Sequence, residues 1–167
     1  GRLFQNLRET HAWTYGSYSS VRSDELPFGG SFSATAESTT SASDSSVAEI
    51  LKEMNRLRTE PISQEELQGV KNFMAGTFAL GLEDPRTLAR FAINEKKYNM
   101  PKDYYKNYLK NVDAVTTQDV MDVSKKYITP GIATITVAGD RKVIAEKMKQ
   151  FGPVTFYDLN GKVVKDT

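Results

Sequence analysis

An arginine and a tyrosine near the start of the chain could together bind and polarise a carbonyl group. Arg8 lies in the last turn of a predicted helix, and Tyr15 and Tyr18 lie on the strand predicted to follow it. A guanidinium group presents a planar set of donors suited to carboxylate or carbonyl oxygens. A tyrosine hydroxyl can donate to a carbonyl that becomes an oxyanion. Spacing alone favours a structural alternative, in which Arg8 complements the helix C-terminus and Tyr15 is a sheet aromatic.

The numbers of histidine and cysteine residues limit which metal sites and nucleophilic catalytic sites the chain can form. His11 is the single histidine, and there is no cysteine. A catalytic zinc site needs at least two imidazole or thiolate ligands plus a carboxylate, so the sequence predicts no metal site. A Ser-His-Asp triad lacks its Gly-x-Ser-x-Gly turn, and Gly29-Gly30 opens no phosphate-binding helix. We interpret His11 as a residue at the end of a helix, near the negative end of its dipole.

The composition is that of an ordinary globular domain. Of 167 residues, 39% are hydrophobic and 26% are charged, with a net charge of +1, which favours one domain over residues 1–167. The mixed charges predict no nucleic-acid partner, and the short apolar runs predict no membrane span. The absence of cysteine leaves the compartment undecided, with the bacterial periplasm or the cytoplasm favoured.

The elements that must position Arg8 and the tyrosines form a short helix and a hairpin. Periodicity predicts a helix over residues 2–10, and aromatic and β-branched residues predict a strand over 13–22. A turn over 24–30 and an alternating strand over 32–37 complete the hairpin. Residues 38–46 are predicted to be a local loop with Asp44 as the next N-cap, the alternative being a flexible interdomain linker.

The remainder of the chain is predicted to be mostly helical. Ser63 and Glu66 form a capping box, Pro101 starts a helix, and Thr116 or Thr117 caps another. Apolar stripes predict helices over residues 47–57, 67–78, 88–91, 104–109, 120–127 and 143–151. A β-run at 132–138 is predicted to be a buried central strand, and residues 153–158 are predicted to be an edge strand.

This order predicts an α+β fold with an antiparallel or mixed sheet and helices packed on one face. Four strands are few for so many helices, and the chain opens without Met in a helical pattern. Both features predict a sheet truncated at its N-terminal side, and therefore a piece of a longer chain. An open sheet edge of this kind would favour self-association.

Three segments of the chain resemble one peptidase family. The segment Leu7-Arg8-Glu9 to Trp13-Thr14-Tyr15-Gly16-Ser17-Tyr18-Ser19 is similar to the Leu-Arg-Glu-Lys-x-Gly-x-x-Tyr-x-x-Tyr-Ser signature of the pitrilysin-type peptidases, the inverted zincins. That signature belongs to their C-terminal half, which carries no zinc. Residues 62–80 resemble the long helical stretch of that half, and residues 104–120 with Ala138-Gly139-Asp140 resemble its closing helices and strand. The chain departs from the signature at Ala12, where the family usually has glycine.

The resemblance implies one half of a clam-shell zinc metalloendopeptidase that cleaves peptides or unfolded chains. Zinc, bound by His-x-x-Glu-His and a distal glutamate, would belong to a homologous half in the same or a partner chain. The resemblance further implies that Arg8 binds the substrate backbone, that Tyr15 polarises the scissile carbonyl, and that Tyr18 is the next aromatic residue of the site. The chain alone is then expected to be inactive. The alternatives are a non-catalytic structural or assembly subunit that keeps the fold, and an unrelated α+β binding module.

Overall fold

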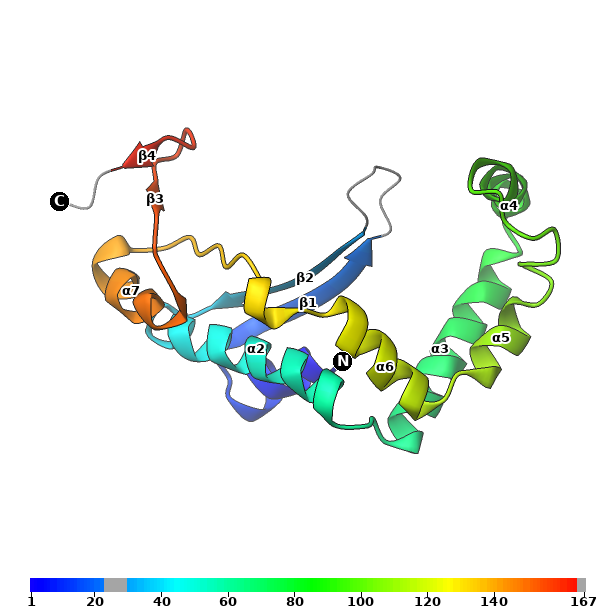
Figure 1. The fold of residues 1–167 in the computed structure, drawn as a ribbon, viewed down its shortest axis with the longest axis horizontal. Coiled ribbons are helices and arrows are strands. Elements are labelled where there is room, and N and C mark those ends of the chain that lie inside the picture. The colour runs from blue at the N-terminus through cyan, green and yellow to red at the C-terminus, as the bar shows by residue number, and fades with distance from the viewer. Residues whose placement is uncertain (23–29, 165–167) are drawn as a thin grey trace. The chain divides into compact units, whose positions relative to one another are not determined.

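The structure, a computed structural model, describes residues 1–22 and 30–164 (Figure 1). The turn predicted over residues 24–30 therefore lies largely outside the described residues. The chain divides into two compact units, which we describe separately. The first unit comprises Gly1–Asn55 and Thr129–Thr167, and the second comprises Arg56–Ile128. The prediction of one domain over the whole chain is not tested by this division and stays a prediction.

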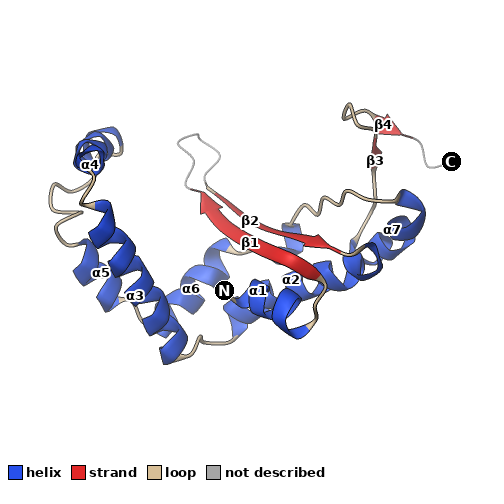
Figure 2. Cartoon of the chain, turned by 180° about the vertical axis from the view of Figure 1, so that it is seen from behind, coloured by secondary structure: helices blue, strands red, loops and turns tan. Residues whose placement is uncertain are grey.

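The first unit begins with a helix and an antiparallel hairpin, as the sequence predicts. Helix α1 (Arg2–Phe4) continues directly into η1 (Gln5–Thr10), which is a π-helix. Strand β1 (Thr14–Arg22) then pairs with β2 (Ser31–Ser38), with Tyr18 opposite Thr35 (Figure 2). The aromatic and β-branched residues of the two strands fit this pleated pairing.

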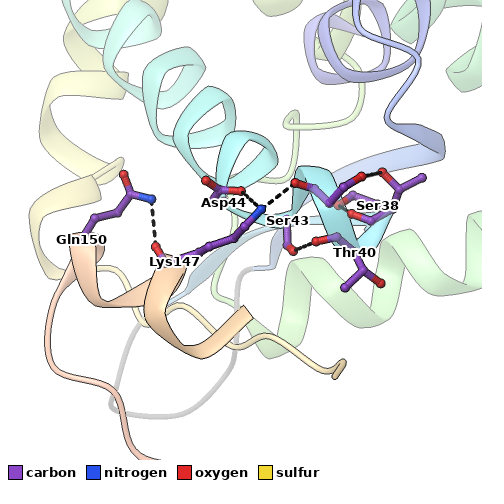
Figure 3. A network of polar contacts seen from close by, with 8 residues as sticks. Ser38, Thr40, Ser43, Asp44, Lys147 and Gln150 are labelled. Carbon is purple, nitrogen blue, oxygen red and sulfur yellow. Dashed lines mark hydrogen bonds and ion pairs between the residues drawn. The ribbon is translucent and has the colours of Figure 1, made fainter. Parts of the chain in front are cut away.

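Residues 38–46 form local structure, which makes the linker alternative wrong. A 3-10 turn, η2 (Thr40–Ala42), leads into α2 (Ser43–Thr59). Asp44 lies inside the first turn of α2, so its prediction as the N-cap is wrong. Its carboxylate instead accepts a hydrogen bond from Lys147 Nζ at 3.2 Å, and this bond lowers the pKa of Asp44 (Figure 3). A carboxylate in the first turn also complements the helix dipole.

The first unit ends with a helix and a small hairpin. The 3-10 turn η3 (Pro130–Ile132) precedes α7 (Arg141–Met148), whose N-cap Asp140 accepts from Lys142 N. After η4 (Lys149–Phe151), the predicted edge strand appears as β3 (Phe156–Tyr157), paired with β4 (Val163–Val164).

The buried central strand predicted over residues 132–138 is absent from the described structure. Ile132 ends the 3-10 turn η3 and is 83% exposed, and residues 133–138 form neither helix nor strand. A strand is defined by its hydrogen-bonded neighbours, and no main-chain bond joins residues 134–138 to any described residue. The prediction of a buried central strand over this segment is therefore wrong.

The second unit consists of helices whose starts follow local capping rules. Ser63, the N-cap of α3 (Gln64–Gly81), accepts from Glu66 N, and Asp84 caps α4 (Pro85–Lys97). Thr116 and Asp119 form a complete capping box for α6 (Thr117–Tyr127). The helix predicted from Pro101 is wrong in its start, because residues 102–107 form turns and α5 spans Tyr108–Ala114.

Aromatic stacking holds the helices of the second unit together. Phe78 of α3 stacks on Tyr108 of α5 at 4.5 Å between ring centroids, and Phe91 of α4 stacks on Tyr105 at 3.6 Å. Phe78 and Phe91 also stack on each other at 5.8 Å. Such pairs add to the free energy of simple area burial, so they link α3, α4 and α5.

The architecture confirms the predicted α+β class, with antiparallel pairing in two separate two-stranded sheets. Within residues 1–22 and 30–164, no helix is long and apolar enough to cross a membrane. Buried apolar side chains are few among the described residues, and Leu7, with no exposed surface, is the most deeply buried of them. The core of the first unit therefore depends strongly on this one side chain.

We expect Leu7→Ala to lower the free energy of unfolding of the first unit by about 2–5 kcal/mol, because it leaves a cavity under the hairpin. Chemical denaturation followed by the fluorescence of Trp13, the single tryptophan, reports this unit. Leu159→Ala makes the same chemical change at a fully exposed position and should have almost no effect. Equal effects of the two substitutions would contradict the importance of Leu7 to the core.

Candidate functional site

The candidate site is built on the junction between η1 and β1. The helix ends with main-chain hydrogen bonds that join residues five and six positions apart. His11 N donates to Asn6 O at 3.1 Å, and Trp13 N donates to Leu7 O at 3.0 Å. π-type turns of this kind are rare and occur frequently at functional sites. The sequence predicts a helix here and gives no signal of its widened geometry.

Ala12 ends the helix in the left-handed conformation, with φ at +55°. This conformation crowds the Cβ of every residue except glycine, which is why helices commonly end on glycine. The departure from the family signature at this position is thus a strained one. Alanine fits without strain only in a backbone that is not left-handed, and the structure shows that this condition is not met.

Asn6 anchors the π-helix to α2. Its side-chain amide donates to Glu49 Oε2 at 2.8 Å and to Glu53 Oε1 at 3.2 Å. The bond from Asn6 is the main cause that lowers the pKa of Glu49, and the bond from Lys52, at 2.9 Å, is the next. Nothing in the sequence pattern identifies Asn6, because its two partners lie more than forty positions away along the chain.

A β-bulge places Tyr15 and Tyr18 in solvent together. Residues 14–17 of β1, four in number, lie opposite the three residues 36–38 of β2, and both Thr14 and Ser17 are buried. The extra residue reverses the alternation of faces. Tyr15 and Tyr18 are therefore both outward, with 91% and 74% of their surfaces exposed. In a regular strand, residues three apart would lie on opposite faces.

The bulge is stabilised by its own side chains. Thr14 Oγ1 donates to Gly16 O at 2.6 Å and accepts from Gly16 N at 3.0 Å. A Cβ on Gly16 would lie 3.2 Å from the hydroxyl oxygen of Tyr18, so the absence of a side chain lets the Tyr18 ring lie close to the backbone. Thr14 and Gly16 are thus positioning residues that the sequence reasoning missed.

Arg8 is half exposed and makes weak contacts within its own helix. Its guanidinium carbon lies 4.8 Å from the Phe4 ring centroid, and its Nε lies 3.9 Å from Glu9 Oε1. An exposed ion pair at that distance contributes little, so a carboxylate or carbonyl ligand could replace Glu9. In the described structure no hydrogen bond joins Arg8 to Tyr15 or Tyr18. Arg8 precedes the junction and the tyrosines follow it.

His11 occupies the position that the sequence predicts, as the C-cap of η1. Its ring stacks on Trp13 with 4.1 Å between centroids and 13° between planes. In the described ranges, no group of three His, Asp or Glu side chains is arranged to hold a metal ion. The described residues around the junction therefore offer hydrogen bonding and charge complementation, and the predicted absence of a metal site stays a prediction.

Comparisons with known proteins agree with the family resemblance. Residues 1–74 match the family model described as the peptidase M16 inactive domain. The fold is similar to the crystal structure of a peptidase M16 inactive domain from Pseudomonas fluorescens, with a TM-score of 0.68 and 19% sequence identity. That match covers 77% of this chain and 30% of the other, so the chain spans under a third of the solved structure. No curated protein matches. The predicted likeness to the non-zinc half of a pitrilysin-type protein is confirmed.

We expect Asn6→Ala to destabilise the first unit at neutral pH and to do so much less at acidic pH. The pKa of Glu49 is lowered in the folded chain. Its ionised form therefore contributes stability above the ordinary value of 4.5, and that contribution is lost as the pH falls through the folded pKa. Denaturation followed by Trp13 fluorescence from pH 7 to pH 3 measures the difference. Gln5→Ala, at the exposed neighbouring position, is the control, and a pH-independent effect of Asn6→Ala would contradict the assignment.

Ala12→Gly is expected to stabilise the first unit by about 1 kcal/mol, because glycine adopts a positive φ without crowding. The free energy of unfolding from the same fluorescence measurement tests this. Ala48→Gly, inside α2, is the matched control and should destabilise by roughly 1 kcal/mol. If both substitutions destabilised the chain, the left-handed conformation of Ala12 would be refuted.

Proposed function

We propose, from the match of residues 1–74 to the peptidase M16 inactive domain, that this chain is the peptide-binding half of a zinc metalloendopeptidase. That match and the fold support the coarser statement, a non-catalytic half of a peptidase-fold protein. The finer statement is that this half holds a substrate peptide for cleavage by residues that the chain does not contain.

One observation carries the proposal: three side chains suited to a peptide, Arg8, Tyr15 and Tyr18, are at least partly exposed around the junction of η1 and β1. Tyr15 is almost fully exposed and Tyr18 is largely exposed, although large aromatic rings usually gain from burial. The bulge and the close of the π-helix fix the backbone on either side of them. Pre-organised donors of this kind stabilise developing charge without reorganisation during the reaction.

Each residue would have a distinct role towards the peptide. The Arg8 guanidinium would donate to main-chain carbonyl oxygens or to a terminal carboxylate, where its planar donors give direction as well as charge. The Tyr15 hydroxyl would donate to the scissile carbonyl oxygen as negative charge develops on it. The Tyr18 ring, supported by the backbone at Gly16, would flank the peptide.

The hydrolytic group would come from a homologous half in the same or a partner chain. This chain has one histidine and no cysteine, and among its described residues no three His, Asp or Glu side chains form a group that could hold a metal ion. The fraction of the solved relative that the chain covers, 30%, is compatible with a further half.

A structural or assembly subunit is the second candidate, and the contacts of Arg8 favour it. The guanidinium already lies over Phe4 and near Glu9, so a packing role at the helix end accounts for its position. The exposure of Tyr15 has no such explanation, because no described residue hydrogen-bonds to its hydroxyl.

In the two-half enzyme, we expect Tyr15→Phe to lower peptide turnover by about a hundredfold with little change in KM, the scale of losing one oxyanion donor. Arg8→Ala should mainly raise KM, because it removes ground-state binding. Tyr157→Phe changes an exposed tyrosine on β3 and is the control. Steady-state kinetics on a fluorogenic peptide separates the two effects. Unchanged kinetics in both variants would favour the structural subunit.

A further inference from the structure

One asparagine of the chain is followed directly by glycine, and it lies in the turn between β3 and β4 (Figure 1). Asn160-Gly161 is the only such pair among the eight asparagines of the sequence, because in the other seven pairs the next residue carries a side chain. The main-chain nitrogen of the following residue can attack an asparagine side chain. Glycine permits the close approach of main-chain atoms that this attack needs.

The turn is closed by hydrogen bonds within residues 158–162. Asp158 O accepts from Gly161 N at 3.0 Å, and Asp158 N donates to Lys162 O at 2.9 Å. The carboxylate Oδ1 of Asp158 accepts from Asn160 N at 2.8 Å and from Lys162 N at 2.9 Å. Aspartate commonly binds main-chain N–H groups two residues further along in turns. All of these bonds are local, so the geometry of the turn follows from its own sequence.

The side chain of Asn160 is left out of this set of bonds. Asn160 takes part in the turn through its main-chain N–H, and within the described structure no hydrogen bond holds its side-chain amide. Asn160 and Gly161 are both exposed, so the side chain can rotate towards the next main-chain nitrogen. Gly161 has a φ of +75°, which residues with a Cβ rarely adopt. The residue that the turn requires is therefore also the one that leaves this nitrogen accessible.

The strands that flank the turn are short. β3 and β4 pair at two positions, and an isolated two-stranded hairpin is marginally stable in water. Local opening, which breaks the bond from Gly161 N to Asp158 O, therefore costs little free energy. By contrast, helices α2, α3 and α4 contain Asn55, Asn72 and Asn94, and helical hydrogen bonds hold the main-chain N–H groups there.

We propose that Asn160 is a modification site, at which the chain deamidates without an enzyme. The main-chain nitrogen of Gly161 loses its proton to hydroxide and attacks Cγ of Asn160. A bond forms between these two atoms, the Cγ–Nδ2 bond breaks, and the side-chain amide leaves as ammonia after taking a proton from water. The product is a cyclic succinimide. Water then opens the ring at either carbonyl, which leaves aspartate or isoaspartate at this position, and no oxidation or reduction takes place.

Either product changes the turn. The new carboxylate lies two residues from Asp158, whose Oδ1 already accepts two main-chain N–H groups. Isoaspartate also adds a methylene group to the main chain, and turn geometry sets the register of a hairpin. The guanidinium carbon of Arg141, on α7, lies 3.9 Å from the ring centroid of Phe156, which holds β3. The change should therefore fall mainly on the turn and on β4.

Incubation of the folded chain at pH 9, followed by peptide mass spectrometry, tests the proposal. Cleavage after lysine isolates residues 150–162, in which Asn160 is the single asparagine. This peptide should gain the mass difference between a hydroxyl and an amino group, and chromatography should separate its aspartate and isoaspartate forms. The reaction should be slower at pH 6, where less hydroxide is present. Peptides that contain the other asparagines should stay unmodified over the same interval.

Variants of the turn separate the chemistry from the local geometry. Gly161→Ala places a Cβ beside the attacking nitrogen and should suppress the modification, and Asn160→Gln should abolish it, because the ring formed would be larger. Asp158→Ala removes the carboxylate that holds two main-chain N–H groups, so it should accelerate the reaction. Leu159→Ala is the matched control, at a fully exposed position of the same turn, and should react as the unaltered chain does. Circular dichroism checks the fold of each variant.

Two results would overturn the proposal. One is modification at Asn160 that is no faster than at the seven other asparagines. The other is an equal rate in the unaltered chain and in Gly161→Ala. Neither result bears on the proposed peptide-binding function, because these residues lie outside that site.

Discussion

Leu7 lies beneath the junction of η1 and β1, and its carbonyl accepts the N–H of Trp13 across six residues. The buried side chain holds the end of the helix while the main-chain bond turns the chain into the strand. Asn6, one residue earlier, binds α2 through two carboxylates. The positions of Arg8 before the junction and Tyr15 after it both depend on this arrangement.

Both units leave large apolar side chains in solvent. Phe73 on α3 is 74% exposed, Leu80 is 68% exposed, and Ile132 in η3 is 83% exposed. Extensive exposed apolar surface marks interaction sites in soluble proteins. The chain spans under a third of the solved M16 inactive-domain structure to which it is similar. In the proposed two-half enzyme, exposed apolar side chains of this kind would lie where the homologous half packs.

The parts of the fold that follow from short-range rules could be predicted from the sequence. Ser63 and Thr116 cap their helices because the partner atom lies three residues away, and alternation identifies the hairpin from residues within one strand. Asp44 and residues 132–138 could not be placed, since each depends on a distant neighbour: Lys147 for the first and an adjacent strand for the second. The site residues were found by resemblance, whereas their orientation depends on a bulge that the pattern does not show.

The bulge that begins at Thr14 explains why Tyr15 and Tyr18, three positions apart, lie on the same face of the strand. Successive side chains of a strand point to opposite faces of the sheet. Two aromatic residues three positions apart can therefore share a face only where a β-bulge inserts one extra residue between them. Where both tyrosines of a Tyr-x-x-Tyr motif in a strand face the same side, the spacing therefore indicates a β-bulge between them. Deleting one residue between the tyrosines would restore a regular ladder and keep the pair on one face, but it would shift everything before the strand, including the junction that carries Arg8.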